Sequence, residues 1–454
     1  MSRNRQGRAP QPHRRQTLDV RTSLPKAINL HRNGRLEEAE QLYRRILAVQ
    51  PANPSALNFL GVLLHQRGDS TEAVRLLERS IAHHSDYADA HNNLGIVLSS
   101  LGRFAEAVAA YRRAIGCRAI FPEAYNNLGV ELRLQGDLEE AIQVLRQGIA
   151  IKPDYADAYI SLGRALREAD QLDAAIQAFQ EGLRHNPRNP YGYRQLGRLL
   201  YSLNRIEEAV ACFREWTRHH PDDPEAWHML AAVTGENVPV RAADDYMQAL
   251  FDRFADNFDQ QLRRLDYRAP SLLAAAIAME WETPNPVPRV LDAGCGTGLC
   301  GPLLRPYARY LIGVDLSPGM IAKAQGRNVY DELVVAELTA FMREQTDGFD
   351  LIVSADTLVY FGDLEPPLRA AAAVLSPDGL LAFTVERLVD GAEDFHLNPS
   401  GRYAHSLPYL HRLLQSAGLT PLSIVSADLR LEGGQPVGGY VVLARKSPGP
   451  ASVV

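Results

Sequence analysis

Small apolar residues recur every 34 positions through the first half of the chain. One series runs through Ala27, Gly61, Gly95, Gly129, Gly163, Gly197 and Ala231, and a second through Ala39, Ala73, Ala107, Ala141, Ala175 and Ala209. Small residues at a fixed spacing mark places where two paired helices approach too closely for larger side chains. The pattern predicts an all-α solenoid over residues 20–235, with six two-helix repeats and a capping helix.

Residue types at matching positions of the repeats resemble the pattern of a known repeat family. Leu94-Gly95, Ala107, Tyr111 and Ala114 follow the L-G, A, Y, A order of the tetratricopeptide repeat, which the segment resembles. A proline after the second helix, as at Pro51, cannot donate the next helical hydrogen bond and therefore ends that helix. The resemblance implies a concave surface that recruits a protein or peptide.

Side-chain amides recur on the first helices of these repeats. The set is Asn58, Asn92, Asn93, Asn126 and Asn127. Amides at a fixed pitch can pair with the backbone of an extended peptide, as in the similar asparagine ladder of O-GlcNAc transferase. A polar, solvated groove face is the alternative interpretation. Ile160 and Arg194 stand where asparagine would continue, so any ladder is short.

The second half has a different period. Beyond residue 240, apolar runs of strand length alternate with helical segments, which is typical of a parallel sheet flanked by helices. We expect one α/β domain over 240–446, preceded by the solenoid. Residues 1–19 carry several arginines and read as a disordered basic tail, and 447–454 as a flexible C-terminal tail.

A glycine-rich turn follows the first of these strands. Gly294, Gly296 and Gly298 let the turn pass close to a ligand, with helix N-terminal amides facing it. A dinucleotide site needs G-x-G-x-x-G, but Leu299 stands where its third glycine belongs. Asp292 would repel a pyrophosphate and suits a cationic amino-acid group. The spacing therefore favours S-adenosylmethionine over NAD.

At these residues the chain resembles the class I S-adenosylmethionine-dependent methyltransferases, which have a Rossmann-like α/β fold. The resemblance implies that Asp315 binds both ribose hydroxyls and that Glu337 contacts the adenine amine. It also implies that Asp356 and Tyr360 lie between cofactor and substrate. The expected cofactor-binding set is Asp292, Gly294, Gly296, Gly298, Asp315, Leu316, Met320, Glu337, Leu338, Asp356 and Phe258.

Phe258 comes from a segment that resembles the entry helix of small-molecule methyltransferases. That segment runs from Phe251 to Asp259 and has the order F-D-x-x-A-x-x-F-D. Its aromatic residues are equally consistent with an ordinary amphipathic core stripe.

Catalytic candidates follow from the chemistry of methyl transfer, an in-line displacement that needs alignment and, for a protonated nucleophile, a base. His405 is the preferred general base because imidazole titrates near neutral pH. Tyr360 is the second catalytic candidate, with His396, Arg402 and Tyr403 as further pocket residues. A surface loop with hydrogen-bonded His and Tyr is the alternative. The segment after the fourth strand lacks the N/D-P-P-Y motif, which disfavours DNA bases and glutamine amides as acceptors.

Composition narrows the classes further. A formal net charge of -6 and the lack of a long apolar run imply neither a nucleic-acid nor a membrane partner. Four cysteines are too few and too badly spaced for a disulfide framework or a zinc site, so we expect no metal and a reducing, cytoplasmic location. Two other functions stay open: a scaffold whose methyltransferase-like domain binds cofactor without turnover, and a nicotinamide-dependent oxidoreductase, which the glycine spacing disfavours.

Overall fold

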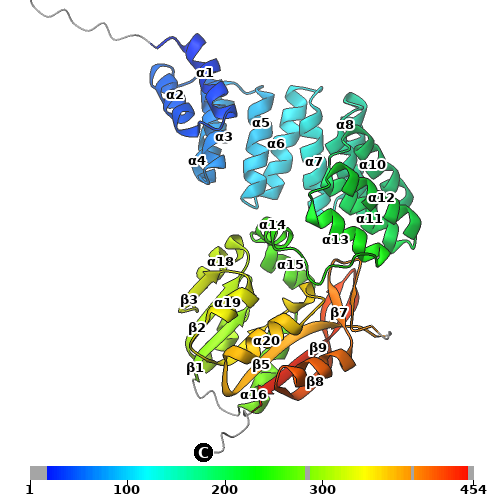
Figure 1. Cartoon of the computed structure of the whole chain (residues 1–454). Coiled ribbons are helices and arrows are strands. Elements are labelled where there is room, and N and C mark those ends of the chain that lie inside the picture. The colour runs from blue at the N-terminus through cyan, green and yellow to red at the C-terminus, as the bar shows by residue number, and fades with distance from the viewer. Residues whose placement is uncertain (1–17, 282–286, 390–392, 448–454) are drawn as a thin grey trace, which may run out of the picture. The chain divides into compact units, whose positions relative to one another are not determined.

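A computed structural model describes residues 18–281, 287–389 and 393–447 (Figure 1). Of the two predicted tails, residues 1–17 and 448–454 lie outside the described residues. The chain divides into two compact units, 1–195 and 196–454, which are described separately below.

The first unit is built of antiparallel helix pairs (Figure 1). Within each pair the two helices pack together, and each odd-numbered helix also contacts the next odd-numbered one, from α1 to α9. The odd-numbered helices therefore form one continuous row. The helices are α1 (Val20–Arg32), α2 (Leu36–Val49), α3 (Pro54–Gln66), α4 (Ser70–His83), α5 (Ala88–Ser100), α6 (Phe104–Cys117), α7 (Pro122–Gln135), α8 (Leu138–Ile151), α9 (Ala156–Glu168) and α10 (Leu172–His185).

The glycines of the 34-residue series face a large side chain of the paired helix. A Cβ added at Gly95 would lie 2.5 Å from Tyr111 Cε1, and one at Gly129 would lie 2.4 Å from Leu145 Cγ. Both distances are well inside van der Waals contact, so any larger residue would force the helices apart. The sequence period thus records how closely the helices of each repeat approach.

The repeated asparagines bond to one another across neighbouring first helices. Asn93 Nδ2 donates to Asn58 Oδ1 at 2.9 Å, and Asn127 Nδ2 donates to Asn92 Oδ1 at 2.9 Å. Each pair joins one repeat to the next, which uses part of the capacity that a peptide ligand would need. Asn58 and Asn92 are buried, whereas Asn93 and Asn127 are partly exposed.

Three further helices continue the repeat pattern. α11 (Pro190–Ser202) crosses the division between the units, and α12 (Ile206–His219) and α13 (Pro224–Thr234) belong to the second unit. None of the helices in the described part of the chain has the length and apolar composition needed to traverse a bilayer.

The second unit contains one mixed sheet (Figure 1). Its parallel strands follow the order β3-β2-β1-β4-β5, and β5 also pairs with antiparallel β9, which pairs with β8. The short strands β7 and β6 extend the sheet from the end of β5. The strands are β1 (Val287–Ala293), β2 (Ala308–Asp315), β3 (Glu332–Val335), β4 (Phe349–Ser354), β5 (Leu375–Arg387), β6 (Phe395–Leu397), β7 (Tyr403–His405), β8 (Leu419–Glu432) and β9 (Gln435–Lys446).

Helices cover both faces of this sheet. Successive strand residues point to opposite faces, so Val290 packs with α16 while Leu291 packs with α19, α20 and α21. The helices are α14 (Asp244–Phe254), α15 (Phe258–Arg264), α16 (Ala269–Glu280), α17 (Gly301–Leu304), α18 (Pro318–Gln325), α19 (Leu338–Glu344), α20 (Glu365–Val374) and α21 (Leu407–Ser416). Because strand order reverses between β1 and β4, the carboxyl ends of these strands open onto a crevice, where ligands of such sheets bind.

The last repeat helix is joined to this sheet by polar contacts within the second unit. His228 of α13 donates from Nε2 to the carbonyl of Gly401 at 2.9 Å, and Tyr403 donates from its hydroxyl to the carbonyl of Pro239 at 2.7 Å. Beyond Pro239, the connecting segment pairs with the loop that follows β4, through Gly362 N to Val240 O and Ala242 N to Tyr360 O, both at 2.9 Å. α13 and this segment are therefore built into the second unit.

Candidate active site

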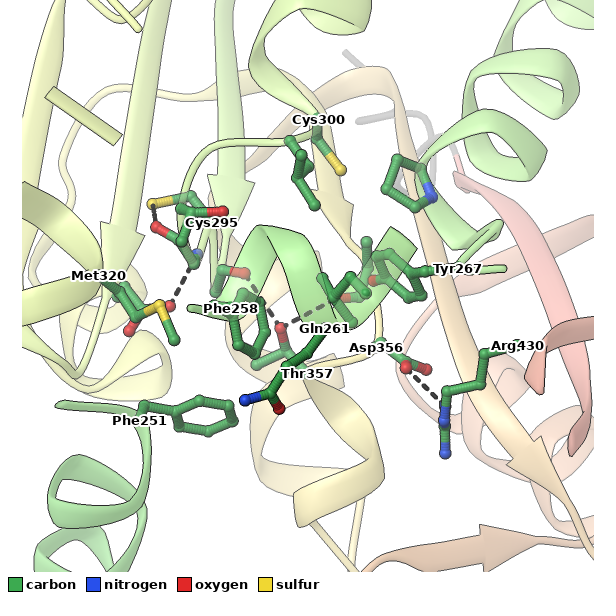
Figure 2. A pocket seen from close by; sticks show the side chains of 18 of the residues that line it. Phe251, Phe258, Gln261, Tyr267, Cys295, Cys300, Met320, Asp356, Thr357 and Arg430 are labelled. Atoms are coloured by element: carbon green, nitrogen blue, oxygen red, sulfur yellow. Dashed lines mark hydrogen bonds and ion pairs between the residues drawn. The ribbon is translucent and has the colours of Figure 1, made fainter. Parts of the chain in front are cut away.

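Two adjoining cavities lie at the carboxyl ends of the parallel strands. The larger has a volume of about 200 Å³ (Figure 2), and the smaller about 70 Å³. Both are lined by residues that follow β1, β2 and β4, so the crevice expected from strand order is present. The shared lining residues are Phe251, Gly294, Asp315, Thr357 and Tyr360.

The glycine turn after β1 forms one wall of the larger cavity. Gly294 has φ +79, and a Cβ there would lie 2.1 Å from Thr357 Oγ1. Gly296 has φ +54 and donates its amide to Asp315 Oδ2 at 2.8 Å. Positive φ values and this close approach require glycine, and they place the backbone directly against the cavity.

Asp315 ends β2 and borders both cavities. Besides the Gly296 amide, its carboxylate accepts the Ser317 amide on Oδ1 at 2.9 Å. Burial raises the pKa of Asp315, and these two backbone hydrogen bonds oppose the rise. The side chain is thus held by the chain on one side while it faces the cavities on the other.

The entry segment is fastened to these loops by its two aspartates. Asp252 Oδ1 accepts hydrogen bonds from Ser317 Oγ and from the Gly319 amide, and Asp259 Oδ1 accepts one from Thr297 Oγ1. Both contacts bring α14 and α15 over the cavity. Phe258 lines it, with its ring centroid 6.1 Å from that of Phe251.

The smaller cavity combines apolar walls with three acidic residues, Asp244, Asp315 and Glu337, and with Arg241. Leu316 and Leu338 line it, while Glu337 caps α19 by accepting the Ala340 amide on Oε2 at 2.8 Å. Glu337 Oε1 is buried and accepts no hydrogen bond from the described residues, although Arg241 Nη1 lies 3.4 Å away. A largely apolar slot with an acceptor that lacks a hydrogen bond suits a planar ring that carries an amine.

The far end of the larger cavity is charged. Arg430, which is 3% exposed, pairs through Nη1 with Asp356 Oδ2 at 2.6 Å, and through its other nitrogens with Glu386 and Glu432. Arg402 pairs with the same two glutamates. Asp356 has φ +56, uncommon outside glycine. Burial raises its pKa, and the guanidinium groups of Arg430 and Arg402 oppose that rise.

Comparisons with known proteins agree with this architecture. A family model described as a methyltransferase domain matches residues 247–424. Models described as tetratricopeptide repeats match residues 24–79, 53–119, 132–193 and 166–233. The chain carries a methyltransferase domain joined to tetratricopeptide repeats.

Individual relatives cover only part of the chain. It is 35% identical over 154 residues to Methyltransferase-like protein 27 of Homo sapiens, which covers 32% of this chain and 62% of that protein. It is 29% identical over 136 residues to Malonyl-[acyl-carrier protein] O-methyltransferase of Salmonella typhimurium, which covers 30% of this chain and 51% of that protein. The chain thus spans less than two thirds of the length of both relatives. A solved structure of MamA protein is 24% identical, with a TM-score of 0.33, and covers 37% of this chain and 92% of that one.

Most of the residues expected at the cofactor site of the methyltransferase domain are brought together by the fold. They come from five separate segments, and each borders at least one cavity. They are Gly294, Gly296, Asp315, Leu316, Met320, Glu337, Leu338, Asp356 and Phe258, and the catalytic candidate Tyr360 borders both cavities as well. Burial raises the pKa of Tyr360, so its phenol keeps its proton and can donate a hydrogen bond at neutral pH.

Two of the expected residues lie behind the glycine turn instead. Asp292 is fully buried, with Oδ2 accepting the Tyr330 hydroxyl at 2.6 Å, and Oδ1 has no hydrogen-bond partner among the described residues. A Cβ at Gly298 would lie 2.9 Å from Tyr330 Cε2. The two residues therefore support the turn by packing against Tyr330, and neither is among the described residues that border the cavities.

Replacing Asp292 with Asn is expected to stabilise the ligand-free protein at high pH. Burial raises the pKa of Asp292 to about 7, against about 3.9 in an unfolded chain. Between these values the unfolded state is ionised and the folded state is not, so wild-type stability falls as pH rises. The Asn variant should gain about 1–3 kcal/mol between about pH 4 and pH 7 and then stay level.

Urea denaturation of both proteins at several pH values measures this gain. Asp347→Asn, at a side chain that is 80% exposed, is the matched control and should give no pH-dependent difference. A gain that is the same at every pH, or a loss at high pH, would show that Asp292 is not a buried charge.

His405 is also remote from the cavities of the methyltransferase domain. It is fully buried on β7, and Nε2 donates to the carbonyls of Phe361 and Gly362 at 2.9 and 3.1 Å. Burial lowers the pKa of His405 to about 4, so the ring is neutral. A neutral imidazole whose proton is held by two carbonyls anchors the loop after β4. His405 therefore positions the loop after β4. It does not border the cavities, so it is not placed to remove a proton from a methyl acceptor there.

The three further pocket candidates near His405 lie in different places. Arg402 borders the larger cavity, whereas Tyr403 packs beneath α13 and His396 lies at an exposed position near Glu393, with 3.5 Å between His396 Nδ1 and Glu393 Oε2. Of these three candidates, only Arg402 borders a cavity in the described structure.

Several cavity residues escaped the sequence interpretation. Arg430, Tyr267 and Gln261 border the larger cavity, and Arg241 borders the smaller one. Arg430 stands in a long hairpin strand among apolar and polar residues, and its burial is visible only in the structure. Tyr267, Gln261 and Arg241 precede the first strand and carry no motif, so their distance in sequence concealed them.

Proposed function

We propose that the second unit transfers a methyl group from S-adenosylmethionine, which spans the two cavities. The observation that carries this proposal is the position of Asp315, whose carboxylate borders both cavities beside the glycine turn. A carboxylate with two acceptor oxygens matches a ribose diol. The ribose would then lie between an adenine in the smaller cavity and a methionine group in the larger.

The residues fit this cofactor at both ends. Glu337 Oε1 is buried beside the smaller cavity, 3.4 Å from Arg241 Nη1 and without a hydrogen bond from the described residues, and the adenine amine would supply that hydrogen bond. Gly294 and Gly296 border the larger cavity with their backbone at positive φ, which suits a turn that runs beside a ligand. Leu299 borders the cavity where a dinucleotide turn needs glycine, which supports S-adenosylmethionine over NAD.

S-adenosylmethionine would supply an electrophilic methyl group on a sulfonium ion. The chain's part is to bind and orient the two reactants and to exclude water, and this alignment is the main source of rate in such a displacement. Tyr360, packed edge-on against Phe251 with ring centroids 5.4 Å apart, is placed to orient an acceptor. The relative named as a malonyl O-methyltransferase offers an oxygen acceptor as one precedent for this chain.

Calorimetric titration of the full chain tests the proposal. S-adenosylmethionine and S-adenosylhomocysteine should bind with micromolar affinity, and NAD should not bind. Binding of NAD alone would favour an oxidoreductase. Binding of S-adenosylhomocysteine without any labelled methyl transfer to a broad set of acceptors would favour the scaffold alternative, in which the domain holds cofactor without turnover.

We further propose that the repeats recruit a protein or peptide partner. The support is the repeat family itself, whose stacked helices present one continuous row, and the amides of Asn58, Asn92, Asn126 and their neighbours along that row. Asn93, Asn126 and Asn127 are partly exposed, so we expect a ligand to contact these amides. A cytoplasmic location stays a prediction.

A further inference from the structure

A cluster of carboxylates and arginines forms the charged end of the larger cavity. Its members are Asp356, Glu386, Glu432, Arg402 and Arg430. Three carboxylates surround two guanidinium groups, and Arg198 also acts electrostatically on Glu432. Figure 2 shows Asp356 and Arg430 on the side of the cavity opposite Met320 and Cys295, away from the glycine turn and the end of β2. This end is thus the one that a methyl acceptor would reach.

Both guanidinium groups are already occupied. Arg430 uses Nη1 on Asp356, Nη2 on Glu386 and Nε on Glu432, and Arg402 uses Nε on Glu386 and Nη2 on Glu432. An arginine that binds a substrate carboxylate needs a free edge of two N–H groups. Here the Nε–Nη2 edge of each arginine is taken by the chain's own glutamates, so these edges orient carboxylates and do not present a cationic fork.

One acceptor atom of this cluster is left over. Asp356 Oδ2 takes the Arg430 contact, whereas Oδ1 is buried and has no hydrogen-bond partner among the residues that the structure describes. A buried acceptor without a partner is costly unless a ligand or water satisfies it. The backbone of Asp356 is held at φ +56, and strain of this kind at a cavity wall is a common feature of ligand contacts.

We propose that this end of the cavity recognises an amine: the methyl acceptor presents a nitrogen with N–H groups, which Asp356 Oδ1 accepts. The inference rests on the proposed methyl transfer and names its substrate class. A buried carboxylate oxygen that lacks a hydrogen bond favours a group that carries N–H donors and disfavours a carboxylate. The proposed acceptor therefore differs from the one named for the malonyl O-methyltransferase relative.

Sinefungin provides a probe that needs no knowledge of the acceptor. It is an S-adenosylmethionine analogue that carries a protonated amine on the carbon that replaces the sulfonium, so the amine projects toward the acceptor side. Wild-type protein should bind sinefungin about tenfold more tightly than S-adenosylhomocysteine, the effect of one charge-assisted hydrogen bond. This measurement needs no variant.

Asp356→Asn should remove that preference. Its sinefungin affinity should fall about tenfold more than its S-adenosylhomocysteine affinity does. Asparagine tolerates positive φ, so the fold should persist. Asp378→Asn is the matched control, since Asp378 also has φ +60 and is exposed on the turn within β5, and it should change neither affinity.

The outcomes separate this inference from the function on which it rests. Wild-type protein that binds both ligands equally, or an Asp356→Asn variant that weakens both by the same factor, would overturn the amine assignment and leave methyl transfer standing. Wild-type protein that binds neither ligand would overturn both. Loss of sinefungin preference alone, with thermal denaturation unchanged, is the expected result.

Discussion

Replacement of Asp315 by Ala is expected to lower the affinity for S-adenosylhomocysteine by about 100- to 1,000-fold. Two charge-assisted hydrogen bonds to the ribose hydroxyls, each worth about 1.5–3 kcal/mol, would be lost, and about 3–4 kcal/mol corresponds to that factor. The variant also loses the contacts to the Gly296 and Ser317 amides, which loosens the glycine turn. Isothermal titration calorimetry measures the change.

Asp331→Ala is the control for this experiment. Asp331 also accepts a strand amide, from Leu311 N to Oδ2 at 2.7 Å, but it lies at the opposite end of β3 from Glu337. Its removal should leave S-adenosylhomocysteine affinity within about twofold, since it borders neither cavity in the described structure. An Asp315→Ala protein that is folded and binds as well as wild type would refute the placement of the ribose.

Cutting the chain within the connecting segment should be the second large effect. A fragment of residues 243–454 is expected to be unstable and to lose cofactor affinity, whereas residues 196–454 should fold and bind. The shorter fragment lacks His228 and its bond to Gly401, the Tyr403 partner at Pro239, and the backbone pairing with residues 360–362. At about 1 kcal/mol per hydrogen bond, this loss approaches the stability of a typical domain.

The apolar contacts add to that loss. Ala231 and Ala232 of α13 pack with Leu397 and Tyr403 of the sheet extension, and Arg241 and Ala242 border the smaller cavity. Circular dichroism of the two fragments measures their melting temperatures, and calorimetry measures their affinities for S-adenosylhomocysteine. Equal melting temperatures and equal affinities would show that the methyltransferase domain begins where its sequence pattern begins, near residue 240.

Local patterns predicted the fold well because each one reports a physical constraint. The 34-residue series records helix contacts at Gly95 and Gly129 that admit no side chain, and the alternation after residue 285 records a sheet covered on both faces. The end of the repeats was harder to place. Helix α13 fits the repeat pattern, yet its contacts lie in the second unit. A helical period in the sequence does not determine which element a helix packs against.

The site was predictable only where function is tied to a turn. Gly294, Gly296 and Asp315 stand at fixed places after β1 and β2, where backbone geometry dictates both residue type and position. Arg430 reaches the cavity from a hairpin far along the chain, and that meeting depends on tertiary packing. His405 shows the opposite case. Its imidazole suits a general base, but no feature of the sequence indicates that the side chain is fully buried.

A crystal structure of the full chain with S-adenosylhomocysteine tests the central claim most directly. The account predicts that the adenine lies in the smaller cavity with its amine on Glu337 and that the ribose hydroxyls bond to Asp315. The sulfur should lie in the larger cavity, facing Tyr360 and Asp356. A ligand bound elsewhere on the chain, or in these cavities with its ribose away from Asp315, would contradict it.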